Sequence, residues 1–163
     1  MNAEFIQNLP TAEQAIARLR EIGMPRRNNE LWSFFPVAKI PTQEFPDACA
    51  CEDDFSKEND FAALLPLAKN ARTMKRTIPD GAAEMAMLKC NNDFGHTVLE
   101  IGKGAKVSLE ILDNKVAHDI AAERFDINVG ENADVEIFFA NPACDLPLRF
   151  RHFNINQAAG STV

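Results

Sequence analysis

The stretch Ile101-Gly102-Lys103-Gly104-Ala105-Lys106-Val107-Ser108-Leu109 recurs in outline 28 residues later as Val129-Gly130-Glu131-Asn132-Ala133-Asp134-Val135-Glu136-Ile137. Both copies carry an apolar residue, a glycine, an inner alanine and then alternating apolar residues. A weaker third copy, Ile155 to Val163, follows at an offset of 26, with Ala159 in the place of Ala133. Self-similarity at a fixed period of this length is typical of architectures in which each repeat stacks on the one before.

This repeat predicts a mainly β protein, a parallel β-helix (β-solenoid) with 26–28 residues per coil, preceded by a small helical N-terminal region. We expect the helical region at residues 1–72 and a truncated solenoid at residues 73–163. An antiparallel β-sandwich is the alternative, because similar strands also recur in that fold. A hexapeptide β-helix is disfavoured, because Asp113 and Asn141 stand where a six-residue apolar repeat would continue.

The remaining pattern indicates helices first and short strands afterwards. Helices are expected at residues 11–22, 29–35 and 57–65, and strands at 74–78, 98–101, 106–112, 125–129 and 135–139. We expect Thr11 to cap the first helix, Gly23 to end it, and Pro66 to end or kink the third. Residues 41–54, rich in acids and prolines, are expected to form a linker.

Composition narrows the classes of function. The chain has 163 residues and a formal net charge of −7, which argues against a duplex nucleic-acid partner. The first ten residues lack a basic start and an apolar core, so no signal peptide is expected, and no apolar run reaches the length of a membrane span. We therefore expect a cytoplasmic protein with reduced cysteines.

Few residues suggest a catalytic or metal-binding role. Cys49 and Cys51 form an isolated Cys-x-Cys, a weak candidate for metal binding because no second pair of ligands is nearby. Cys90 and Cys144 are expected to be small buried residues. His96, His118 and His152 are spaced near the repeat, so they either stack into a ladder or make separate hydrogen bonds. No nucleophile elbow, phosphate-binding loop or dinucleotide fingerprint is present, so we expect no catalytic residues and no enzyme activity.

Two stretches resemble a known family. Gly23-Met24-Pro25-Arg26-Arg27-Asn28-Asn29-Glu30-Leu31-Trp32 resembles the N-terminal signature of the SufB/SufD family of iron–sulfur cluster assembly scaffold proteins. Thr77-Ile78-Pro79-Asp80-Gly81, followed by residues 96–102, resembles the entry into that family's β-helix. Ser33 departs from the family, which usually has a basic residue there. We expect the motif residues to be structural, with the tryptophan buried; they are Gly23, Pro25, Arg26, Arg27, Glu30 and Trp32.

The resemblance implies a SufD-like scaffold rather than an enzyme. The chain would correspond to the family's N-terminal region and first coils, with a SufB-like scaffold and a SufC-like ATPase as partners. Iron–sulfur clusters would form on the full complex, and this chain alone would bind none tightly, since no position matches the family's candidate ligands. We also expect a homo-oligomer, formed through the open end of the solenoid. The alternative is a stand-alone carbohydrate-active β-helix enzyme, which would present clustered acids along one face, or a structural interaction module.

Overall fold

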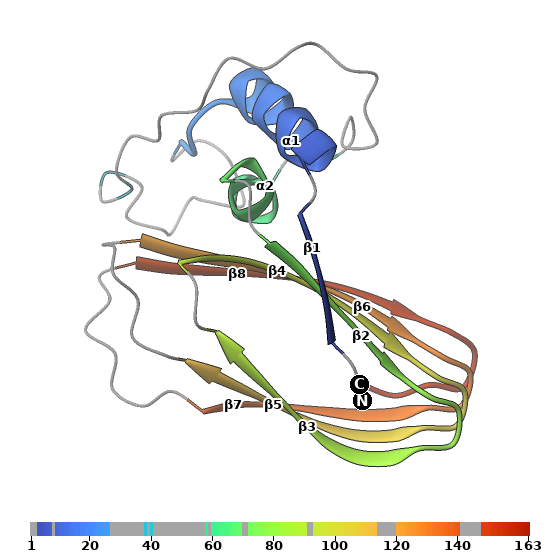
Figure 1. Ribbon diagram of the computed structural model, residues 1–163. Helices are drawn as coiled ribbons and strands as arrows, with labels where there is room; N and C mark the ends of the chain where they lie inside the picture. The colour runs from blue at the N-terminus through green and yellow to red at the C-terminus, as the bar shows by residue number, and fades with distance from the viewer. Residues whose placement is uncertain are drawn as a thin grey trace.

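The computed structural model describes residues 3–7, 9–26, 38, 40, 58, 60–69, 72–90, 93–113, 120–140 and 148–163. Within these ranges the chain forms two helices and eight strands, and the strands make two sheets (Figure 1). The chain is therefore mainly β, as the sequence predicts. The helix expected at residues 29–35 and the linker expected at 41–54 lie outside the described residues.

Successive strands alternate between the two sheets. The elements are β1 (Ala3–Gln7), α1 (Leu9–Ile22), α2 (Phe61–Ala68), β2 (Arg72–Ile78), β3 (Ala83–Cys90), β4 (Phe94–Ile101), β5 (Lys106–Asp113), β6 (Ile120–Val129), β7 (Asp134–Ala140) and β8 (Leu148–Gln157). The larger sheet has the order β1-β2-β4-β6-β8 and the smaller one β3-β5-β7. Only the β1–β2 pair is antiparallel among these strands. The antiparallel sandwich is thus ruled out, and tight turns join the two facing sheets along one side (Figure 1).

The strand register confirms the repeat of 28 residues. Leu109 pairs with Ile137 in the smaller sheet, and Ile127 pairs with Ile155 in the larger one. The second pairing shows that the offset of 26 expected for the third copy is wrong, because that offset would place Ile155 beside Val129. A shift of two residues leaves the same side chains on the same face of a strand, so apolar alternation alone cannot separate the two registers.

The turn between the sheets resolves this ambiguity. Gly81, Gly104, Asn132 and Gly160 each have a positive φ, between 54° and 71°, at equivalent places in successive turns. The backbone N–H groups of the first three each donate to a carbonyl of the next turn. Asparagine and glycine are the residues that adopt this left-handed conformation readily, so their spacing marks the turns.

An earlier copy of the repeat was not expected from the sequence. Ile78 pairs with Ile101, and Ala83 pairs with Lys106, each at an offset of 23 residues. Pro79 stands where the later copies have Gly102. This shorter step and the missing glycine explain why β3 was not predicted.

The main core lies between the two sheets. Val107, Leu109 and Val135 are almost fully buried in it, and Ile137 packs against it with partial exposure. These four residues hold equivalent places in the two copies of the repeat, from which an inward direction is predicted, and the structure confirms it. Parallel strands with buried inner faces thus build one continuous apolar interior.

The helices differ from the expectation at two points. α1 begins at Leu9, so Thr11 lies inside the helix and does not cap it, while its end at Ile22 agrees with the prediction. Gly23 follows with φ +72°, and its N–H donates to the Leu19 carbonyl oxygen, as in a glycine-terminated helix. α2 is capped by Asp60, and Pro66 lies inside it instead of ending it. A proline near the C-terminal end removes only one backbone hydrogen bond, and α2 stops two residues later.

The two helices cover part of the outer face of the larger sheet (Figure 1). α1 and α2 form a second core with Ile120 and Ala122 of β6 and Phe150 of β8. Every residue of α2 is buried, because α2 lies between α1 and the sheet. In the described ranges, no helix has both the length and the apolar character needed to cross a membrane. The division at residue 72 stays a prediction, although β1 pairs with β2 across it.

Candidate functional site

The residues singled out from the sequence are only partly described by the structure. Gly23 ends α1, Pro25 and Arg26 follow it, and Cys90 is buried at the end of β3. The other candidates lie outside the described residues; they are Arg27, Glu30, Trp32, Cys49, Cys51, His118 and Cys144. The predicted roles of the family-motif residues therefore stay predictions.

The two described histidines do not form a ladder. His96 and His152 share a row across the larger sheet, but Arg124 lies between them. His96 Nδ1 lies 2.9 Å from the Thr73 hydroxyl, and His96 Nε2 lies 2.6 Å from Asp126 Oδ2. A hydroxyl, an imidazole and a carboxylate in series are the groups of a hydrolase triad. Here Thr73 is only 1% exposed, so its hydroxyl is closed to substrate and the chain of contacts is structural.

Asp126 is held as a carboxylate by its neighbours. Burial alone would raise the pKa of Asp126, but hydrogen bonds from His96 and Arg124 lower it. The charge of Arg124 and a hydrogen bond from Asn154 lower it further, so that the pKa lies far below its usual range. Asp126 is therefore an obligatory hydrogen-bond acceptor at physiological pH.

The same row anchors α2 to the sheet. Arg124 Nη1 lies 3.7 Å from Glu58 Oε2 and donates to the Ala63 carbonyl oxygen at 3.5 Å. His152 Nδ1 lies 3.1 Å from Oδ2 of Asp60, the cap of α2. These contacts fix the helices over one part of the outer face and leave the rest of it exposed.

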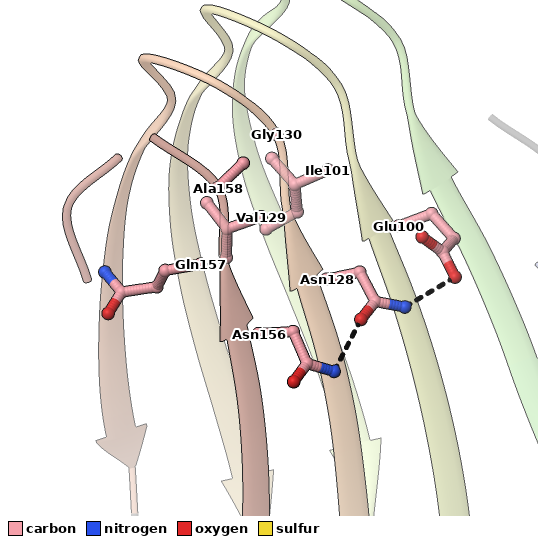
Figure 2. Close-up of a pocket in the computed structure, with 8 residues that line it drawn as sticks. All are labelled: Glu100, Ile101, Asn128, Val129, Gly130, Asn156, Gln157 and Ala158. Carbon is pink, nitrogen blue, oxygen red and sulfur yellow. Dashed lines mark hydrogen bonds between the residues drawn. The ribbon is translucent and has the colours of Figure 1, made fainter. Parts of the chain in front are cut away.

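The exposed part of this face carries rows of side-chain amides. Asn128 Nδ2 donates to Glu100 Oε1 at 2.9 Å, and Asn156 Nδ2 donates to Asn128 Oδ1 at 2.9 Å (Figure 2). In the neighbouring row Asn154 Nδ2 donates to Asp126 Oδ1 at 3.1 Å. The first row borders a shallow hollow lined by Glu100, Ile101, Asn128, Val129, Gly130, Asn156, Gln157 and Ala158. These rows were not predicted from the sequence, although Glu100, Asn128 and Asn156 recur at the repeat spacing.

The interior between the sheets is exposed at β7 and β8. Ile111 of β5 is fully buried, but Phe139, its partner in β7, is 50% exposed. Ile127 of β6 is likewise fully buried, whereas Ile155, its partner in β8, is 37% exposed. We call the set Phe139, Phe153, Ile155 and Val163 the open rung; Phe153 is partly buried and the other three are exposed. Phe153 stacks on Phe125 at 4.8 Å between ring centroids, so the open rung continues the interior outward.

The opposite end of the interior is closed. Arg76 Nη2 lies 2.6 Å from Glu84 Oε1, and this pair joins the inner positions of β2 and β3. β1 also occupies the edge of β2 in the larger sheet. β8 has one neighbour, β6, among the described strands. The two ends are thus unlike, and the open rung together with the β8 edge is the candidate interaction surface.

Neither a metal-binding cluster among the described residues nor a match to a known protein indicates what this surface binds. The described ranges hold no cluster of three or more His, Cys, Asp or Glu side chains that could bind a metal ion. Comparisons of the chain with protein-family models, with curated proteins and with solved structures each find no match. The functional conclusion therefore depends on the geometry and on the resemblance of the motif residues.

Proposed function

We propose that this protein is a SufD-like scaffold and interaction component of iron–sulfur cluster assembly, without catalysis of its own. We also propose that its paired sheets form the coils of a parallel β-helix. The alternation of strands between two sheets, the repeated register and the aligned left-handed turn residues support the second proposal. The sequence resemblance around Gly23 to Trp32 supports the first.

One observation carries the scaffold proposal. Ile111 and Ile127 are fully buried, whereas their partners in the next strands, Phe139 and Ile155, are 50% and 37% exposed. A free strand edge beside exposed apolar side chains pairs readily with another polypeptide. At the other end the inner positions are closed by the Arg76–Glu84 pair, and the exposed Met85 and Met87 of the edge strand β3 lie on its outer face. An interaction surface at one end of the interior only is suited to a component that binds its partner in a single orientation.

The partners follow from the resemblance. A SufB-like scaffold and a SufC-like ATPase are the proposed hetero-partners. The homo-oligomer expected from the sequence would place a second copy at the open rung instead, and light scattering distinguishes the two. The iron–sulfur cluster is the cargo of the whole complex, and this chain alone holds none tightly. A cytoplasmic location is part of the same proposal.

Co-purification tests the scaffold proposal. The chain should be retained by a SufB-type scaffold, alone or with a SufC-type ATPase. Ile155→Glu places a charge in the open rung and should abolish retention. Met85→Glu is the matched control, because Met85 is 76% exposed on the outer face of the smaller sheet, away from the open rung. Equal loss in both variants, or no retention of the unmodified chain, would contradict the proposal, and hydrolysis of a polysaccharide would contradict the absence of catalysis.

A further inference from the structure

The hydrogen bonds of each amide row all run in the same direction, which is set by a carboxylate, Glu100 in β4 or Asp126 in β6. A carboxylate only accepts hydrogen bonds, so the amide beside it must present its N–H₂ group. Glu100 thereby orients Asn128, and Asn128 in turn presents its oxygen to the N–H₂ group of Asn156 (Figure 2). Asp126, held as a carboxylate, orients Asn154 in the same way. Both rows therefore direct donors back towards the carboxylates.

The consequence appears at the edge of β8. With their N–H₂ groups bound to Asp126 and Asn128, Asn154 and Asn156 direct their amide oxygens away from β6. Both asparagines are exposed. The outer face of this edge is thus an acceptor surface, while its inner face carries the apolar side chains of Phe153 and Ile155.

We propose that the β8 edge binds a β-strand of a partner polypeptide of different sequence from this chain. That strand places hydrogen-bond-donating side chains beside Asn154 and Asn156, and apolar side chains beside Phe153 and Ile155. The proposal depends on the proposed scaffold function and adds the chemistry of its partner. Addition of a strand to an open edge obtains affinity from the backbone and specificity from alternate side chains.

The direction of the rows disfavours a second copy at this edge. Two open β8 edges that meet with the same face outward run antiparallel about a two-fold axis, which brings identical groups together. In the register centred on Ile155, the amide oxygens of Asn154 and Asn156 would then face each other across the axis. Reversing either amide would break its hydrogen bond to Asp126 or Asn128. An acid on any partner strand is rejected for the same reason, because its oxygens only accept.

Two peptides cut from this chain's own repeat make a matched test. The first has the ten-residue sequence of β6, Ile120–Val129, and the second is the same peptide with Asp126→Asn. On the free edge of β8, in the register that β6 itself uses, residue 126 lies beside Asn154 and residue 128 beside Asn156. Residues 125 and 127 then cover Phe153 and Ile155. The peptides differ only in whether an acceptor or a donor meets Asn154.

Fluorescence anisotropy of each labelled peptide, titrated with the whole chain, gives the answer. We expect the Asp126→Asn peptide to bind roughly tenfold more tightly, the factor that about one hydrogen bond provides. Simple attraction to the arginines of β8 would favour the acidic peptide instead, so the two explanations have opposite signs. In the chain, Asn154→Val should abolish the difference, and Ser108→Val on the smaller sheet should leave it intact.

Equal affinities, or tighter binding of the acidic peptide, would overturn the donor requirement. A stable dimer by light scattering that Asn154→Lys disrupts would show that a second copy occupies the edge, and it would overturn the proposed hetero-partner. In either case retention by a SufB-type scaffold, measured separately, still decides the scaffold proposal itself.

Discussion

A methyl group added at Gly130 probes the stacking of one turn on the next. A Cβ there would lie 2.7 Å from Lys103 N and 2.8 Å from both Gly102 C and Ile101 O. All three contacts are with backbone atoms of the preceding turn, so relief requires the two turns to separate. Gly130 N also donates to Ile101 O at 2.8 Å, and that hydrogen bond would be strained as well.

We expect Gly130→Ala to cost about 3 kcal/mol of unfolding free energy. Overpacking typically costs about 1–3 kcal/mol, and a lost backbone hydrogen bond adds roughly 1 kcal/mol. Gly104→Ala is the first control, because a Cβ there meets open space and only the positive φ is unfavourable, at about 1 kcal/mol. Gly95→Ala is the second control, because its Cβ would make an ordinary 3.9 Å contact with Glu123 Cγ.

Urea unfolding followed by circular dichroism measures this order. We expect Gly130→Ala to be the most destabilising change, Gly104→Ala intermediate and Gly95→Ala nearly neutral. A Gly130→Ala protein no less stable than the Gly104→Ala protein would refute the close stacking of the turns, and with it the argument for a continuous interior.

Three further predictions concern charge, cargo and the N-terminal motif. The pKa of Asp126 is lowered in the folded chain, so its carboxylate stabilises the fold fully above about pH 4, its pKa in the unfolded chain. This stabilisation is lost as the pH falls towards the lower pKa of the folded chain. Asp126→Asn should therefore make the melting temperature depend less on pH in this acidic range. Anaerobic reconstitution with iron and sulfide should leave no visible charge-transfer band after desalting, and a band removed by changing Cys49 and Cys51 to Ser would contradict this. Trp32 is the sole tryptophan and should emit as a buried indole, so emission at the wavelength of free indole would argue against its packing.

The sequence was sufficient for those parts of the fold that repeat. Copies that share a glycine turn and an inner alanine, such as residues 101–109 and 129–137, predicted parallel stacking and the inward direction of Val107 and Val135. Where a copy departs from that pattern, the prediction was incomplete or wrong. The first copy of the repeat was not predicted because Pro79 stands in the place of the turn glycine. The apolar alternation around Ile155 was compatible with two registers.

The candidate site was harder to predict, because it depends on contacts between turns. The spacing of Glu100, Asn128 and Asn156 is visible in the sequence, but the direction of their hydrogen bonds depends on which of them carries a carboxylate and on the face they share. Asp126 is a fixed acceptor in spite of its burial, because His96 and Arg124 lie beside it and donate hydrogen bonds to it. Such proximity arises only when turns 28 residues apart are stacked.

Hydrogen exchange of the chain, with and without a SufB-type scaffold, shows whether the β8 edge takes up a partner strand. In a strand, the backbone N–H groups that point away from its one neighbour exchange with solvent until another strand covers them. We expect the partner to slow exchange in β8 and to leave the edge strand β3 of the smaller sheet unchanged. Unchanged exchange in β8, or protection at β3 instead, would contradict the claim that the open rung and the β8 edge form the interaction surface of this protein.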